Sequence, residues 1–177
     1  EKKSSLKNDL KDLGVNKPWW ILLGASVMVL VFNSLRDGAA VFYFKYYVTG
    51  SDLWSFSIMD ASLTLITIYL VLGQAFNIVG ILCVPALTRA IGKKLTFLSA
   101  MAVATVLSII FYFLPKDMVV AILSMQILIS FCAGIVSPLM WSMYADIADY
   151  SEWKTGRRAT GLIFSSSSMS QKLGWTI

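Results

Sequence analysis

"MVVAILSMQILISFCAGIVSPLMWSMY", residues 118–144, contains no Asp, Glu, Lys or Arg. A helix rises 1.5 Å per residue, so about 20 apolar residues cross the hydrocarbon layer of a bilayer. An open strand would leave backbone polar groups unsatisfied in lipid, so a helix is the expected structure. This stretch, Met118–Tyr144, therefore predicts a membrane-spanning helix.

The rest of the chain repeats this pattern. The other apolar spans are Trp19–Phe44, Leu63–Leu87, Leu95–Leu114 and a shorter one from Thr160 to Ile177. The 177 residues are 57% hydrophobic and 14% charged, whereas soluble domains are about a quarter charged. The expected fold class is all-α, a polytopic transmembrane helix bundle.

The sequence predicts two parts, a polar segment and a transmembrane helical bundle. Residues 1–17 are polar and Lys-rich and predict a solvated linker, and residues 18–177 form the helical bundle. The chain begins without methionine and ends inside an apolar stretch, so we expect a fragment of a longer protein.

Basic residues alternate between the two sides of the predicted membrane. Eleven of the fifteen fall on one side: Lys2, Lys3, Lys7, Lys11, Lys17, Arg89, Lys93, Lys94, Lys154, Arg157 and Arg158. The other side has only Lys45 and Lys116, while Arg36 and Lys172 lie within spans. Because cytoplasmic loops carry an excess of Lys and Arg, we expect the N-terminal segment and the connections 88–94 and 146–160 to be cytoplasmic. The lipid bilayer, here the plasma (inner) membrane, is then the first expected partner.

Several classes of function are disfavoured. The net charge is +5, but no basic face on a soluble fold is indicated, so no nucleic-acid partner is expected. The chain has no His, which excludes His-based metal sites and general bases within it. We expect no enzyme activity, catalytic residue, metal site or cofactor.

Polar groups within the first and last spans are the candidate pathway residues. Arg36 lies about 24 Å along the helix from Trp20, and Asn33 and Asp37 share a face at i and i+4. In the last span, Lys172 lies about 18 Å from Thr160. A charge at that depth requires a partner or a wet cavity. The neighbouring candidates are Ser167, Ser168 and Gln171.

Small residues mark a second feature. Gly73, Asn77 and Gly80 follow at i, i+4 and i+7, and Gly134 lies in the fourth span. Small residues let membrane helices approach closely, so helix packing is favoured over a substrate contact for the first three. Gly134, with Pro138 in the same span, predicts a bend or a close helix crossing.

"ADIADYSEWKTGRRATG", residues 145–161, concentrates three acids and three bases in one connection. If the fourth helix continues past Tyr144, Asp146, Asp149 and Glu152 form a stripe along it. A helix C-terminus disfavours acids, so cationic partners are expected. The available cations are Arg157 and Arg158 on the same connection, and Arg89, Lys93 and Lys94 on the neighbouring cytoplasmic connection.

Residues 146–161 resemble a specific loop, the one between helices ten and eleven of the glycoside–pentoside–hexuronide:cation symporters, whose best-known member is the melibiose carrier. These carriers belong to the major facilitator superfamily. "RDGAAVFYFKYYVTG" (36–50) resembles their seventh helix, and "PALTRAIGKK" (85–94) is similar to their loop between helices eight and nine, although it lacks the acidic residue of the fuller pattern. The lysine of "SQKLG" (170–174) falls where the family has an intramembrane lysine.

The resemblance implies helices seven to ten and part of eleven of such a fold, with residues 1–17 ending the central cytoplasmic loop. It implies alternating access, a sugar or glycoside substrate, a coupling Na⁺ or H⁺, and a partner in the N-terminal six-helix half. The site would take Lys172, the serines, Arg36 and Asp37, and the acidic and basic residues of 146–158 would form a cytoplasmic gate. Two alternatives stay open: a Mg²⁺-dependent prenyl-diphosphate enzyme using the aspartates, and a non-catalytic membrane subunit.

Overall fold

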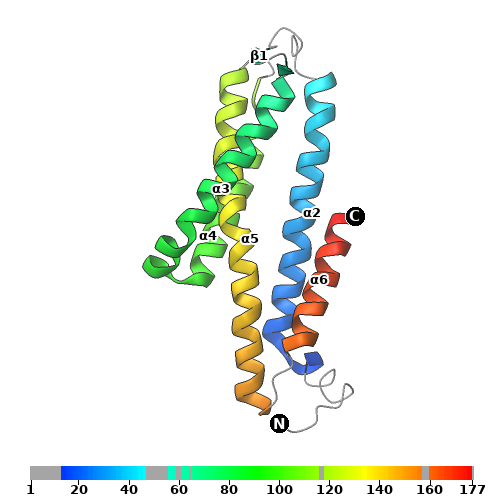
Figure 1. The fold of residues 1–177 in the computed structure, drawn as a ribbon, viewed down its shortest axis with the longest axis vertical. Coiled ribbons are helices and arrows are strands. Elements are labelled where there is room, and N and C mark those ends of the chain that lie inside the picture. The colour runs from blue at the N-terminus through cyan, green and yellow to red at the C-terminus, as the bar shows by residue number, and fades with distance from the viewer. Residues whose placement is uncertain are drawn as a thin grey trace. The chain divides into compact units, whose positions relative to one another are not determined.

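The computed structural model of this chain describes residues 13–46, 56–58, 61–63, 65–115, 118–156 and 160–176. Its elements follow the chain in this order: α2 (Lys17–Tyr46), β1 (Phe56–Ile58), β2 (Ala61–Leu63), α3 (Leu65–Ile91), α4 (Lys93–Tyr112), α5 (Val119–Thr155) and α6 (Thr160–Thr176) (Figure 1). Residues 13–15 are also helical. Within the described part, α2, α3, α4 and α5 are each long and apolar enough to cross a membrane. Four such helices indicate a multi-pass membrane protein.

The helices occur where the hydropathy pattern predicts them, and most of their ends lie within a few residues of the predicted ones. One addition is a small antiparallel hairpin between α2 and α3, in which Phe56 pairs with Leu63 and Ile58 with Ala61. Leu63, the predicted start of the second span, therefore belongs to β2, and α3 begins at Leu65. Runs of three residues are too short for hydropathy to reveal.

Two predicted connections are corrected. Most of the charged stretch 146–160 is helix, because α5 continues to Thr155. The residue that follows the helix is Gly156, whose φ of 67° only glycine adopts readily and whose N–H donates to the carbonyl of Glu152 at 2.8 Å. In the stretch 88–94, the only residue between α3 and α4 is Gly92, with φ 80°.

The chain divides into two compact units. Unit 1 is Glu1–Asp37 with Met140–Ile177, and unit 2 is Gly38–Leu139. Helices α2 and α5 contribute to both. The predicted boundary between residues 1–17 and 18–177 stays a prediction, and residues 1–12 lie outside the described part.

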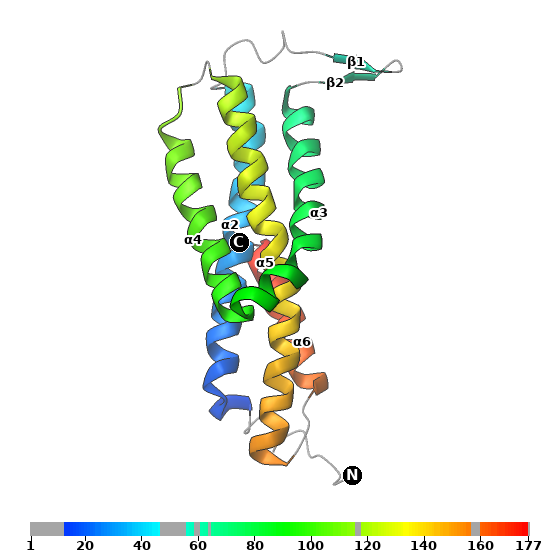
Figure 2. The same cartoon turned by 90° about the vertical axis from the view of Figure 1, so that its left-hand side faces the viewer.

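Unit 2 is held together by a core and a close helix crossing. The core combines Ala40 and Phe44 of α2, Leu65 and Tyr69 of α3, and Val119 and Ile122 of α5. Figure 2 shows α3 and α5 running beside each other. A Cβ on Gly80 would collide with the carbonyl oxygen of Phe131, and one on Gly134 with that of Asn77. The predicted tight crossing is therefore confirmed, and it depends on backbones that only glycine allows to meet.

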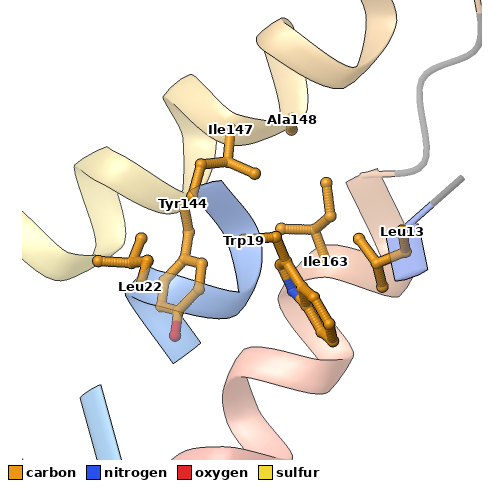
Figure 3. Close-up of a cluster of buried hydrophobic side chains, with 7 residues drawn as sticks. All are labelled: Leu13, Trp19, Leu22, Tyr144, Ile147, Ala148 and Ile163. Atoms are coloured by element: carbon orange, nitrogen blue, oxygen red, sulfur yellow. The ribbon is translucent and has the colours of Figure 1, made fainter. Parts of the chain in front are cut away.

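Unit 1 packs one end of α2, α5 and α6 around a buried cluster (Figure 3). The cluster contains Leu13, Trp19, Leu22, Tyr144, Ile147, Ala148 and Ile163. Farther along α6, a Cβ on Gly174 would meet Leu30 and Val27 of α2. Because residue 19 is near residue 166 and residue 30 is near residue 174, α2 and α6 run parallel.

Candidate functional site

Helix α6 has a packed face and an exposed face. Ile163, Ser167, Ser170 and Gly174 are buried and follow the helical repeat. Ser165, Ser168 and Lys172 are exposed and follow at i, i+3 and i+7. Lys172 and Ser168 therefore share one face, whereas the predicted site residue Ser167 lies on the packed face with no exposed area. Gln171 is partly buried between the two faces. The assignment of these four residues to a pathway stays a prediction.

The serines of α6 donate their hydroxyl hydrogens to the helix itself. Ser168 Oγ donates to the carbonyl of Phe164 at 3.0 Å, and Ser167 Oγ donates to that of Ile163 at 2.7 Å. Such back-bonding satisfies a hydroxyl inside a membrane helix. The oxygen keeps its lone pairs, so Ser168 presents an acceptor on the same face as the Lys172 ammonium, which only donates. This face can pair with a molecule that has both donors and acceptors.

The polar group on α2 lies at the end of the stretch that belongs to unit 1. Arg36 and Asp37 form an ion pair, with Nη2 and Oδ1 3.6 Å apart. The arginine side chain is 18% exposed and the aspartate 46%, so the pair is only partly shielded from its surroundings. Asn33, one turn earlier, is partly buried. The structure thus places all three on neighbouring turns of one helix, as their spacing predicts.

The acidic residues lie on the last turns of α5. Asp146, Asp149 and Glu152 are exposed. The opposite side buries Tyr144, Ile147, Ala148 and Ser151. The condition under which a stripe was expected, continuation of the helix past Tyr144, is therefore met. We call Asp146, Asp149 and Glu152 the acidic stripe.

The proposed cationic partners of the acidic stripe are less defined. Arg157 and Arg158 lie outside the described residues. Arg89 is exposed in the last turn of α3 and belongs to unit 2, whereas the acidic stripe belongs to unit 1. The pairing of the acidic stripe with these three arginines stays a prediction.

Two features around the start of α2 were not predicted from the sequence: a hydrogen bond to α6 and the burial of two residues that precede α2. Trp19 Nε1 donates to Ser166 Oγ at 3.2 Å, which links α2 to α6. Leu13 and Asn16 are 4% and 5% exposed, although residues 1–17 predict a solvated linker. A tryptophan is expected at a membrane boundary, but nothing in its local pattern reveals which distant hydroxyl it reaches.

Comparison with known proteins finds a matching family model and relatives that are named as transporters, carriers or symporters. The family model described as "MFS/sugar transport protein" matches residues 1–177. The isoprimeverose transporter of Lactiplantibacillus pentosus is 31% identical over 179 residues, covering 100% of this chain and 34% of that protein. A glucuronide carrier protein homolog of Escherichia coli (strain K12) is 29% identical, covering 98% of this chain and 35% of that protein. An inner membrane symporter of the same strain is 28% identical, covering 97% and 35%.

The chain thus spans about a third of the length of the curated relatives it matches. Among the residues that the structure describes, no group of three or more Cys, Asp or Glu side chains is placed to hold a metal ion. Nothing in these relatives or in the described residues supports the prenyl-diphosphate alternative. The chain belongs to the MFS/sugar transport protein family, among the glycoside–pentoside–hexuronide:cation symporters of the major facilitator superfamily.

Proposed function

We propose that this chain is the C-terminal part of a cation-coupled sugar symporter, which works by alternating access with an N-terminal six-helix half. The family match across residues 1–177 supports sugar transport, and the name of the E. coli inner membrane symporter supports symport. The names of two other relatives support a sugar or glycoside as substrate. The coupling cation is Na⁺ or H⁺. On this proposal the chain is a transporter rather than an enzyme.

The observation that carries the site is the exposed face of α6. Lys172 lies twelve residues from the start of α6 at Thr160, so its backbone is about 18 Å along the helix. An ammonium at that depth is costly in lipid and is expected to face water or protein. Ser168, one turn away on the same face, adds an acceptor. In transporters of this superfamily type, substrate sites lie near the bilayer midplane between the two halves, so this face would line the site.

The acidic stripe is proposed as part of the gate on the cytoplasmic side. Eleven of the fifteen basic residues support placing that end of α5, and the N-terminal segment, in the cytoplasm. The name of the E. coli inner membrane relative supports an inner-membrane location. Acids at a helix C-terminus are unfavourable alone, so pairing with cations that separate during opening would make a reversible lock.

The test is uptake by the full-length transporter in membrane vesicles. Radiolabelled isoprimeverose and a glucuronide would be offered with an imposed Na⁺ gradient, a pH gradient or neither. Uptake that rises with one gradient supports symport and names the cation, whereas uptake equal under all three conditions contradicts coupling.

The site assignment is tested with three variants in the same assay. Lys172→Ala and Asp149→Ala are expected to reduce uptake at least about tenfold, because one removes the charge from the exposed face of α6 and the other removes a gate partner. Lys45→Ala is the matched control, since Lys45 is an exposed lysine in the last turn of α2 that is assigned to neither the pathway nor the gate. Unchanged uptake in both Lys172→Ala and Asp149→Ala would remove the assignment.

A further inference from the structure

The residues just before the first membrane helix are built into the core of unit 1. Leu13 is 4% exposed and lies in the cluster with Tyr144, Ile147 and Ala148 of α5 and Ile163 of α6 (Figure 3). Its neighbour Val15 is 65% exposed. One side of this short segment is therefore buried while the other faces outward.

Hydrogen bonds fix the same residues to the start of α2. The Asn16 N–H donates to the carbonyl of Leu13 at 3.0 Å, and Asn16 Oδ1 accepts from the Trp19 N–H at 3.4 Å. Trp20 Nε1 donates to the carbonyl of Gly14 at 3.1 Å. Asn16 thus caps α2, because a side-chain oxygen before a helix satisfies one of its unpaired N–H groups.

The cluster that contains Leu13 includes residues from the part of α5 that carries charge. Ile147 and Ala148 lie between Asp146 and Asp149 in sequence, and they face Leu13's cluster while the two acids face outward. Trp19, which is bonded to the cap residue, also donates to Ser166 of α6. Leu13 therefore belongs to a cluster that is built from residues of three helices, α2, α5 and α6.

We propose that residues 13–16 act as a clasp that fixes the chain preceding α2 to the ends of α5 and α6. With the clasp docked, the upstream chain cannot shift without moving the helix end that carries the acidic stripe. A well-packed leucine transmits such a displacement because closely packed interiors compress little. The clasp gives the segment before α2 a direct mechanical connection to the acidic stripe, which a solvated linker would lack.

The clasp is tested by cysteine labelling of the full-length transporter in lipid nanodiscs, with Cys83 and Cys132 replaced by alanine. Ala148→Cys is the reporter, because Ala148 is 1% exposed and belongs to the same buried cluster as Leu13. Only an exposed thiolate reacts with a water-soluble maleimide. Truncating a buried leucine costs more free energy than a tenfold change in an equilibrium, so Leu13→Ala is expected to raise the labelling rate at least about tenfold.

Three comparisons make the result decisive. Val15→Ala removes similar atoms from an exposed side chain and should leave the rate unchanged, and Leu13→Met should restore most of the protection because it nearly conserves volume. A second reporter, Ala104→Cys, is 2% exposed in unit 2 and should stay unlabelled in every variant.

Equal labelling of the Ala148→Cys reporter with Leu13 and with Leu13→Ala overturns the clasp. So does a similar rise with Val15→Ala, or a rise at both reporters, which would mean general unfolding rather than release of one segment. The assay needs no sugar or cation gradient, so its outcome does not depend on the proposed transport function.

Discussion

The hydroxyl of Tyr144 on α5 donates a hydrogen bond to Oγ of Ser26 on α2, and neither side chain has exposed area. The direction follows from the serine's single hydrogen, which Ser26 donates to the carbonyl of Leu22 at 2.6 Å. The tyrosine is thus the only remaining donor for this contact. Two helices that are far apart in the chain are joined here inside the core of unit 1.

This direction predicts unequal effects of the two truncations on stability. Ser26→Ala leaves the Tyr144 hydroxyl buried without its acceptor and is expected to cost about 1–3 kcal/mol. Tyr144→Phe leaves the serine still bonded to Leu22 and is expected to cost about 1 kcal/mol. SDS-titration unfolding of the transporter in mixed micelles measures both. The double variant should cost less than the sum, and strict additivity would mean that the two hydroxyls do not interact.

The glycines of unit 2 predict a contrast between positions. Gly80→Ala and Gly134→Ala place a Cβ against the backbone of the facing helix, and overpacking of this kind costs about 1–3 kcal/mol. Gly24→Ala on α2 meets nothing within 4 Å, and alanine is favoured over glycine in a helix by about 1 kcal/mol. Thermal unfolding midpoints should therefore fall for the first two variants and stay equal or rise for the third. A fall for all three would show that the loss is not caused by the crossing.

Gln126 predicts a substitution that is tolerated despite its burial. This residue is 2% exposed on α5, and its Oε1 has no hydrogen-bond partner among the described residues. Replacing a buried, unsatisfied polar group with an apolar one of similar shape is expected to be neutral or stabilising by about 1–2 kcal/mol. Gln126→Met tests this by the same unfolding assay, with Ser130→Ala as a neighbouring control. A lower unfolding midpoint for Gln126→Met would indicate that a water molecule or a ligand hydrogen-bonds to the side-chain amide of Gln126.

If the proposed gate depends on an ion pair between Asp149 and Arg158, exchanging the two charges should preserve the pair. Asp149→Arg should reduce sugar uptake at least about tenfold, because like charges would then meet at the end of α5. Adding Arg158→Asp should recover a substantial part of it, which uptake at equal expression measures. Trp153→Ala, at an exposed position one turn later on α5, is a control for surface disruption. No recovery in the double variant would contradict the pairing of these two positions.

The spans and the family could be read from the sequence because both depend on local information. A membrane helix satisfies its backbone within its own segment, so an apolar run such as Met118–Tyr144 specifies a span without reference to its neighbours. The glycine spacing of Gly73 and Gly80 likewise predicts a close crossing from one helix alone. The motifs at 146–161 and 170–174 carry the family resemblance in the same local way.

Tertiary structure decided what depends on neighbours. The pattern of four serines does not reveal that Ser167 is packed and Ser168 exposed, because the packed face of α6 is chosen by α2 and α5. The charges of 145–155 resemble a loop, yet this stretch stays helical while Ile147, Ala148 and Ser151 are buried along its other side. The sequence assigns Leu13 to a solvated linker, whereas in the structure it belongs to a buried cluster with residues of α2, α5 and α6. Hydropathy is a property of one segment, whereas burial of a particular side chain is a property of all the segments that meet there.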